Sequence, residues 1–332
     1  MEEIVLDAEV RGEPESAAPE KKPHKKIKQT QLRAIYGFIT AAIPLIAFLI
    51  FSVVPLAITI STMFVSMDGY DFSTMKWNSF ANFAEAFKDT RFWRSIGVSF
   101  TLTVPHMLGL LISLFLSALI AQKLPGHKFF KALYFVPYIV SSVAVAIMWN
   151  WVFNPENGIL NDIIVRLTGA AHGPQWYKDA GKFTLMLIII MVWQAPGYGI
   201  VMFSAAFTNI SSSLYEAAEL DGAGAMQKFL HVTLPAITPT IFYLLIAGII
   251  AGLQTFDIPM MFSGSWEGNA GPKDAGLTTV LYIYFQGIGG GSAGKSVNMP
   301  VASVMSMFLF VVIFVILFIN FKLSDKWVSY DN

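Results

Sequence analysis

Residues 36–64 read YGFITAAIPLIAFLIFSVVPLAITISTMF and contain no Asp, Glu, Lys or Arg. A helix that crosses the hydrocarbon core of a membrane needs about 20 mainly apolar residues, so this stretch is long enough to cross it. Five more long uncharged runs follow, in about 96–121, 132–153, 183–206, 241–262 and 299–321. We therefore expect an all-α membrane protein with six transmembrane helices.

The composition supports a polytopic membrane protein. Hydrophobic residues make up 55% of the 332 residues and charged residues 13%, against about 25% charged residues in soluble proteins. The net charge is zero and cysteine is absent, so we expect no nucleic-acid partner, no disulfide and no thiol chemistry. The five histidines lack the spacing of metal ligands. Aromatic residues mark the ends of several runs, as they do at membrane interfaces, namely Trp93, Trp149, Trp151 and Tyr284.

Basic residues near the runs predict the orientation in the membrane, because Lys and Arg are retained on the cytoplasmic side. They precede the first run, occupy the connection between the second and third, and follow the sixth, at Lys21, Lys22, Lys25, Lys26, Lys28, Arg33, Lys123, Lys128, Lys131, Lys322 and Lys326. Both termini should then be cytoplasmic. We expect residues 1–34 to be a disordered cytoplasmic tail, 35–322 a six-helix transmembrane domain with a cytoplasmic loop at 207–240, and 323–332 a second cytoplasmic tail.

The stretch GGGSAGKS at 289–296 matches the P-loop pattern of nucleotide-binding proteins. A P-loop works only between a buried strand and the start of a soluble helix, whereas this stretch lies between the fifth and sixth runs, on the predicted outer side. We interpret it as a glycine-rich outer loop that binds no ATP. The segment before it, TTVLYIYFQGIG, could form a strand or an interfacial helix.

The connection at 210–240, ISSSLYEAAELDGAGAMQKFLHVTLPAITPT, predicts two short amphipathic helices. Each carries an apolar stripe, formed by Leu214, Ala217 and Ala218 in the first helix and by Met226, Phe229 and Leu230 in the second. Gly222 and Gly224 should separate the helices, and Pro235 should end the second. Ser213 and Glu216 have the spacing of a capping box.

The polar face of this loop is acidic, with Glu216, Glu219 and Asp221 against a single Lys228. Helices that lie on lipid usually present Lys and Arg to the anionic headgroups. Docking of the apolar stripe into a groove of another protein is therefore favoured over contact with lipid.

Residues 216–239 follow the pattern EAAxxDGAxxxxxFxxVxLPxxxP, which resembles the EAA loop of permease subunits of binding-protein-dependent ABC importers. The resemblance extends to NFAEAFKDTRFWRSIGVSFTLT, YFVPYIVSSVAVAIMWNWVFNPENGILN and LQTFDIPMMF, and is to the maltose and glycerol-3-phosphate type of sugar permease. One departure is the outer segment GNAGP at 268–272, where that family has Gly-Gly-Pro.

The resemblance implies a type I ABC importer permease fold in a bacterial cytoplasmic membrane and a subunit that is not an enzyme. The expected partners are a second homologous permease, two ATPase subunits, an extracytoplasmic sugar-binding protein and the lipid bilayer. ATP and Mg²⁺ would be used by the ATPases, so no cofactor is expected in this chain. Coupling to the ATPases would involve Glu216, Ala217, Ala218, Asp221 and Gly222.

Candidate sugar contacts lie in the fourth and fifth runs. Sugars bind by stacking on aromatic rings and by hydrogen bonds to amides, acids and hydroxyls. Trp193, Gln194 and Tyr198 flank Pro196 and Gly197, and Gln254, Thr255 and Asp257 follow in the fifth run. Alternative interpretations are packing roles for Trp193 and Tyr198 and a structural or gating role for Asp257, the ionisable residue deepest in a run.

Other functions remain possible from the residues themselves. A polyol or glycerol phosphate could replace the sugar, although no Arg lies in any run to bind a phosphate. A membrane-embedded enzyme would need Asp257 and His106 to converge, and we expect them at different depths. A proton-driven carrier is disfavoured by the acidic loop, and His106 is expected to stabilise a kink at Pro105.

Overall fold

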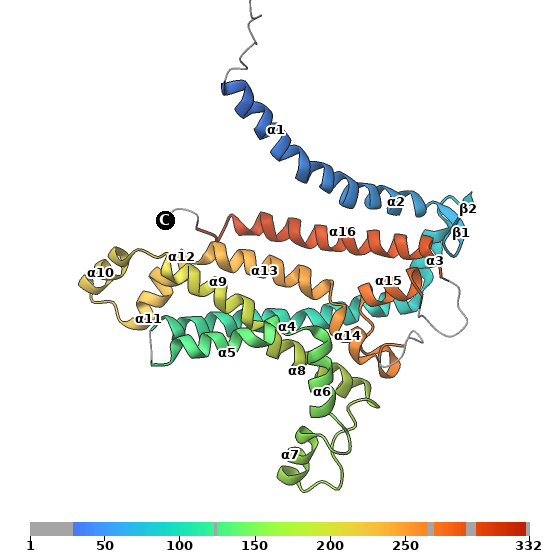
Figure 1. The fold of residues 1–332 in the computed structure, drawn as a ribbon. Helices are drawn as coiled ribbons and strands as arrows, with labels where there is room; N and C mark the ends of the chain where they lie inside the picture. Colours follow the sequence, from blue (N-terminus) through green and yellow to red (C-terminus); the bar gives the residue numbers. More distant parts are fainter. Residues whose placement is uncertain (1–28, 123–124, 264–268, 290–296, 330–332) are drawn as a thin grey trace, which may run out of the picture. The chain divides into compact units, whose positions relative to one another are not determined.

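The computed structural model describes residues 29–122, 125–263, 269–289 and 297–329. Residues 1–28 of the tail predicted at 1–34, and most of GGGSAGKS, from Gly290, lie outside these residues, so both interpretations stay predictions there. Residues 29–34, expected to be disordered, instead belong to a helix that begins at Gln29. The chain divides into two compact units, Met1–Pro55 and Leu56–Asn332 (Figure 1).

The first predicted span, at 36–64, is helical as far as Thr62. It comprises α1 (Gln29–Phe48), a π-helical turn η1 (Leu49–Val53) and α2 (Val54–Thr62). The widened turn ends two residues before Pro55, which has no N–H and whose ring would clash with the carbonyl four residues earlier. The most apolar window within Tyr36–Thr62 has a mean hydropathy of 2.6, as expected of a helix in lipid.

The second unit contains a short hairpin and a set of helices. The hairpin pairs β1 with β2 in antiparallel fashion, with Val65 opposite Trp77 and Gly69 in the left-handed conformation at its turn. The elements are β1 (Val65–Asp68), β2 (Asp71–Trp77), α3 (Ala81–Lys88), α4 (Thr90–Ala121), α5 (His127–Ile139), α6 (Ser142–Val152), α7 (Ile159–Thr168), α8 (Ala180–Gln194), α9 (Pro196–Thr208), α10 (Ser212–Leu220), α11 (Ala225–Lys228), η2 (Phe229–Thr233), α12 (Leu234–Ala236), α13 (Thr238–Leu253), α14 (Asp257–Phe262), η3 (Pro272–Asp274), α15 (Thr279–Gly287) and α16 (Met299–Ser324).

Five segments of the described chain are long and apolar enough to cross a membrane, and they coincide with five of the six predicted runs: Tyr36–Thr62, Thr90–Ala121, Ala180–Thr208, Thr238–Phe262 and Met299–Ser324. The third run, expected as one helix over 132–153, is instead the pair α5 and α6, bent by 99°. Val140 and Ser141 are extended, and the Ser141 hydroxyl caps α6 by accepting from the N–H of Ala144. A new helix therefore starts inside the apolar run (Figure 1).

Helix α4 packs closely on α9 and α13 through small residues. A Cβ added to Gly109 would lie 2.3 Å from the Cβ of Ala195, and one added to Gly199 would lie 2.3 Å from the hydroxyl of Ser113. Gly252 meets Thr103 in the same way, at 2.7 Å. Small residues let helix backbones approach, which is how helices associate in lipid.

The segment TTVLYIYFQGIG forms a helix, α15, and no strand. Leu281, Tyr282 and Phe285 are buried in a cluster shared with α16. Tyr284, expected at a membrane interface, is half-buried and packs on Phe256 at 5.2 Å between ring centroids. The outer segment therefore packs against the helices and does not lie apart from them.

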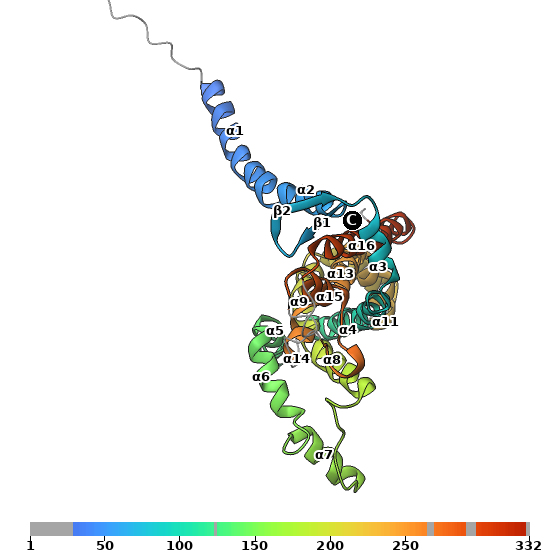
Figure 2. The same ribbon diagram turned by 90° about the vertical axis from the view of Figure 1, so that its right-hand side faces the viewer.

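The loop at 153–179 carries α7 away from the rest of the bundle (Figure 2). Its centre is the buried Asn161, which donates to the carbonyls of Pro155 and Pro174 at 3.0 and 3.2 Å and accepts from the Trp176 indole at 2.7 Å. Tyr177 donates to Asn150, and burial raises the pKa of Tyr177 to about 12. These bonds give the loop a defined shape.

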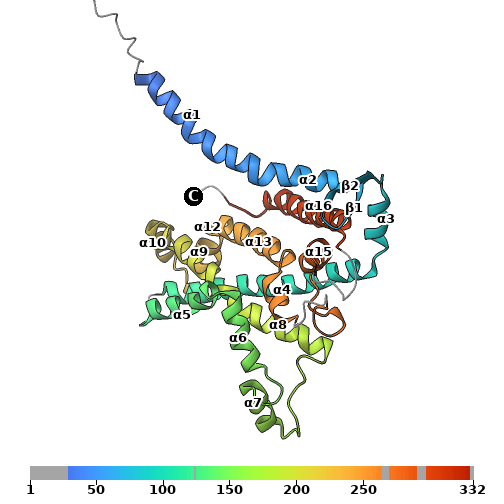
Figure 3. The same ribbon diagram turned by 45° about the vertical axis from the view of Figure 1, so that its right-hand side comes forward.

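The start of α5, the helices α10–α12 and the end of α16 lie at one end of the second unit, and α15 lies toward the other (Figure 3). Trp327, after α16, packs on Phe242 of α13, and the N–H of Ser329 donates to Thr238. This arrangement places the segments that we expect in the cytoplasm on a common side. Which side of the membrane that is stays a prediction.

Candidate functional site: a polar cavity and an exposed helical loop

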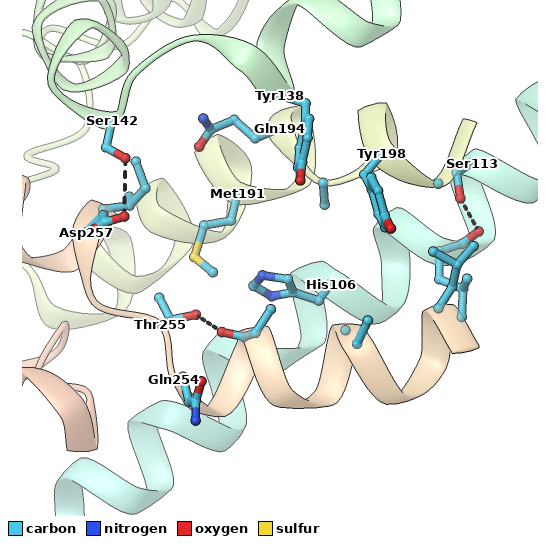
Figure 4. A pocket seen from close by; sticks show the side chains of 18 of the residues that line it. His106, Ser113, Tyr138, Ser142, Met191, Gln194, Tyr198, Gln254, Thr255 and Asp257 are labelled. Atoms are coloured by element: carbon cyan, nitrogen blue, oxygen red, sulfur yellow. Dashed lines mark hydrogen bonds between the residues drawn. The ribbon is translucent and has the colours of Figure 1, made fainter. Parts of the chain in front are cut away.

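A cavity of about 610 Å³ lies among α4, α5, α6, the α8–α9 break and the α13–α14 break (Figure 4). Five of the six predicted pathway residues line it, namely Gln194, Tyr198, Gln254, Thr255 and Asp257. The sixth, Trp193, does not. It is partly buried in a core cluster and meets Trp149 edge-on at 5.6 Å. Neighbouring residues on a helix point in directions about 100° apart, so Gln194 and Trp193 face different surroundings.

Breaks in the helices bring polar groups to this cavity. Helix α8 ends at Gln194 and α9 starts with Pro196, with Ala195 between them. Helix α13 ends at Leu253, and α14 begins at Asp257. The Asp257 carboxylate is therefore at a helix N-terminus, which favours negative charge, and not in the interior of a helix as predicted. Ser142 lies 3.5 Å from it, at the limit of a hydrogen bond.

An aromatic wall occupies one side of the cavity. The rings of Tyr138 and Tyr198 stack with centroids 5.6 Å apart, and the Tyr198 hydroxyl is 3.0 Å from that of Tyr243. Sequence reasoning missed Tyr138, Ser142 and Ser113 as lining residues. The signal that could have indicated these lining residues was the presence of polar side chains, a tyrosine and serines, inside otherwise apolar runs.

His106 also lines the cavity, from α4. Helix α4 continues across Pro105 as a single helix, and the role of His106 in stabilising a kink there stays a prediction. The buried Nδ1 of His106 forms no hydrogen bond within the described part of the protein. His106 and Asp257 both border this cavity, and their different depths in the membrane stay a prediction.

The cavity lining combines polar and apolar residues, and Asp257 is the single carboxylic acid among them. Neither Lys nor Arg is among the residues that border the space. Amide, hydroxyl and aromatic groups supply the remaining polar surface. Such a surface suits an uncharged polar solute better than an anion.

The loop after α9 forms two helical segments, as predicted, around Gly222 in the left-handed conformation (φ 75°). Two details differ. Ser211, and not Ser213, caps α10, so the Ser213–Glu216 capping box is wrong. Pro235 does not end the second helical segment, which runs from α11 through the π turn η2 into α12 and turns at Ile237. As in the first span, the π turn precedes a proline.

The predicted coupling residues lie on the surface of this loop. Glu216, Ala217, Asp221 and Gly222 are exposed, and Ala218 is half-buried. Nearby apolar side chains are strongly exposed, with 91% of Leu220 and 68% of Met226 accessible.

Two contacts tie α10 to the second segment of the loop. The Lys228 amine lies 2.5 Å from the Glu219 carboxylate, and the Tyr215 and Thr233 hydroxyls are 2.8 Å apart. The loop is thus a pre-formed hairpin with an apolar surface. Among the residues that the structure describes, no cluster of three or more His, Asp or Glu is arranged to hold a metal ion.

Comparisons with known proteins agree with these features. Residues 109–330 match the family "Binding-protein-dependent transport system inner membrane component". The chain is 34% identical to the "Probable ABC transporter permease protein YesP" of Bacillus subtilis (strain 168), over 94% of this chain and 96% of that protein. It is 31% identical to the "sn-glycerol-3-phosphate transport system permease protein UgpA" of Escherichia coli (strain UTI89 / UPEC), over 89% and 95% of the two chains.

The fold is that of a solved bacterial ABC transporter involved in alginate import, with a TM-score of 0.76 and 22% identity over 92% of this chain and 100% of that chain. The relatives are permeases and not enzymes. From the family match over most of its length and the identity to these relatives, the chain belongs to the inner membrane components of binding-protein-dependent transport systems, as a multi-pass ABC transporter permease.

Proposed function

We propose that this permease carries an uncharged carbohydrate into the cell and couples that movement to ATP hydrolysis by separate subunits. The observation that supports the cargo most directly is the cavity, whose lining includes amides, hydroxyls and tyrosine rings but neither Lys nor Arg. Sugars present hydroxyls and apolar ring faces, which such groups bind.

A relative named for sn-glycerol-3-phosphate, at 31% identity, suggests a second candidate, glycerol phosphate. A phosphate group usually requires Arg, Lys or converging N–H donors. The cavity instead contains the Asp257 carboxylate, which would repel an anion. We therefore favour a neutral mono- or oligosaccharide.

Coupling is proposed to occur through the hairpin at 210–236. Its exposed apolar side chains, Leu220 and Met226, have the character of a helix that inserts into a groove on another protein. Two ATPase subunits, a second homologous permease and an extracytoplasmic sugar-binding protein would complete the importer. ATP binding would close the ATPases, move the docked hairpins and switch the cavity between the two sides of the membrane.

Membrane sidedness can be tested first. The chain has no cysteine, so a single cysteine in place of Glu216 gives a clean target for maleimide labelling. We expect labelling in inverted membrane vesicles and none from outside intact cells. Labelling of intact cells would place the hairpin outside and contradict the coupling proposal.

Coupling can then be tested in the assembled complex with Glu216→Lys and Gly222→Asp. Matched controls are available in the loop at 153–179, because Glu156 is exposed and Gly169 is exposed with a φ of 67° and open space around it. We expect the hairpin variants to lose sugar-stimulated ATP hydrolysis and uptake, whereas Glu156→Lys and Gly169→Asp keep sugar-stimulated ATP hydrolysis. Equal behaviour of hairpin variants and controls would contradict the docking role.

A further inference from the structure

We propose that Thr278, which does not itself border the cavity, is a positioning residue for cargo recognition. Its hydroxyl holds the break between α13 and α14 in the shape that presents Gln254, Thr255 and Asp257 to the cavity. This inference rests on the proposed function of the cavity. It assigns a role to the start of the segment TTVLYIYFQGIG, whose first residue is Thr278.

The break between α13 and α14 interrupts the regular hydrogen bonding of a membrane span. Helix α13 ends at Leu253 and α14 begins at Asp257, so residues 254–256 are not helical. A carbonyl that such a break frees needs a donor from elsewhere in the protein, because lipid supplies none. Gln254, Thr255 and Asp257 border the cavity at this point (Figure 4). The shape of the cavity wall therefore depends on the groups that satisfy the break.

Thr278 supplies a donor to this break. Its hydroxyl donates to the Thr255 carbonyl at 2.7 Å and accepts from the N–H of Leu281 at 3.3 Å, which caps the start of α15. Thr278 is fully buried, so bulk water does not compete for these hydrogen bonds. A single hydroxyl thus links the start of α15 to the cavity wall.

A second contact from α15 reaches the same break. The ring of Tyr284 packs on that of Phe256 with centroids 5.2 Å apart, and Phe256 also borders the cavity. Thr278 and Tyr284 therefore contact consecutive residues of the break, Thr255 and Phe256. Helix α15 is itself fixed by side chains buried in the cluster that it shares with α16, so it can act as a rigid support for the break.

A role restricted to capping α15 makes a different prediction. Ser99 of α4 provides the comparison, because it is also buried and its hydroxyl bonds to the first residue of α15, accepting from the N–H of Thr279 at 2.8 Å and lying 3.1 Å from its hydroxyl. These bonds do not involve the break, and Ser99 does not border the cavity. If Thr278 only stabilises α15, Thr278→Val and Ser99→Ala should act alike. If Thr278 positions the break, only its replacement changes the cavity wall.

The first experiment measures amide hydrogen exchange in the assembled complex without cargo. The exchange rate of a segment that opens transiently follows the population of its open state. Thr278→Val keeps the side-chain shape and lacks the hydroxyl, whereas Thr278→Ser keeps the hydroxyl. We expect the amides of residues 254–258 to exchange about fivefold faster in Thr278→Val, the factor that corresponds to one lost hydrogen bond. They should exchange at the wild-type rate in Thr278→Ser and Ser99→Ala.

The second experiment measures uptake by the same variants in proteoliposomes that contain the complete importer and its binding protein. The probes are radiolabelled glucose, xylose, maltose and sucrose, with sn-glycerol 3-phosphate as the anionic comparator. Monodeoxy analogues of the sugar that the wild type takes up are then compared with that sugar. The preference of the binding protein itself cancels between variants, because every assay uses the same binding protein. We expect Thr278→Val to reduce the wild-type discrimination against at least one analogue about fivefold, whereas Thr278→Ser and Ser99→Ala keep it.

Wild-type exchange at 254–258 in Thr278→Val would overturn the proposal, and so would wild-type discrimination in that variant. Equal effects of Thr278→Val and Ser99→Ala on the break would do the same. If Thr278→Val does not assemble, Thr278→Ala is read by the same criteria, and failure of both to assemble would assign Thr278 to folding and also overturn the proposal. The proposed function fails separately, if the wild type takes up none of the sugars or only the phosphate ester. The exchange experiment then still decides whether Thr278 holds the break.

Discussion

The close contact between α4 and α9 gives a sharp prediction, because it shapes one wall of the cavity. A Cβ added to Gly109 would lie 2.3 Å from the Cβ of Ala195 and 3.1 Å from its carbonyl carbon. Ordinary contact begins at 3.4 Å, so the closer pair is short by 1.1 Å. Neither Cβ can rotate away, because each is bonded directly to its own backbone. The substitution Gly109→Ala must therefore push α4 away from Ala195, at the junction between α8 and α9.

The magnitude follows from two opposing terms. Overpacking a close contact costs about 1–3 kcal/mol, whereas Ala is better than Gly in a helix by about 1 kcal/mol. Gly97 supplies the control, since it lies on the same helix, is exposed, and has nothing within 4 Å of an added Cβ. Gly97→Ala should therefore gain only the stability that comes from the higher helix propensity of Ala. The difference in stability between the two variants should then be about 1–3 kcal/mol, with Gly109→Ala the less stable.

The thermal unfolding midpoint of the purified complex, monitored by the loss of monodisperse particles, measures which of the two variants is less stable. Uptake should fall in Gly109→Ala as well, because α9 carries Tyr198 into the cavity wall. Equal unfolding midpoints for Gly109→Ala and Gly97→Ala would show that the helices can separate at no cost, and would refute the packing argument.

Three further outcomes are expected. Gly222→Ala should lower coupled ATP hydrolysis, because a φ of 75° costs a residue with a Cβ about 1–2 kcal/mol, whereas Gly222→Asn should be tolerated. Equal losses of ATP hydrolysis in the two variants would contradict a cause in the backbone conformation. Asn161→Ala should destabilise the loop at 153–179 by about 2–4 kcal/mol and increase its cleavage by protease, since three hydrogen bonds are lost; unchanged cleavage would argue against it. Arg91→Lys should lower the unfolding midpoint, because the two 2.7 Å hydrogen bonds from Arg91 to Asp274 require the planar guanidinium group, which Lys lacks. A midpoint equal to that of the wild type would show that this ion pair contributes nothing to stability.

The fold class could be predicted from the sequence because the signal is local. In lipid, a long uncharged run forms a helix whatever surrounds it, because the helix satisfies the backbone N–H and C=O groups within the run itself. Five of the six runs are such helices. The hairpin could also be predicted, since Gly222 and the apolar spacing on each side act within a few residues.

The lining of the cavity could be predicted only in part. Pro196 marked one helix break, and five of six predicted residues border the space. The break at Val140 and Ser141 was missed, because a serine in an apolar run fits a continuous helix as well as an N-cap. Tyr138 and Ser142 were missed for the same reason, since the bend between α5 and α6 places them beside the cavity.

From the residues alone one can predict that this chain lies in a membrane, where most of its helices run, and which loop forms the exposed helical hairpin. Which face of each helix borders the cavity depends on tertiary packing. Trp193 and Gln194 are neighbours in sequence, yet one packs in the core and the other lines the space. His106 borders the cavity for the same reason, because contacts such as that of Thr103 with Gly252 set the rotation of α4 about its axis relative to α13. An almost uniformly apolar helix carries little information about its own rotation, so packing between small residues supplies it.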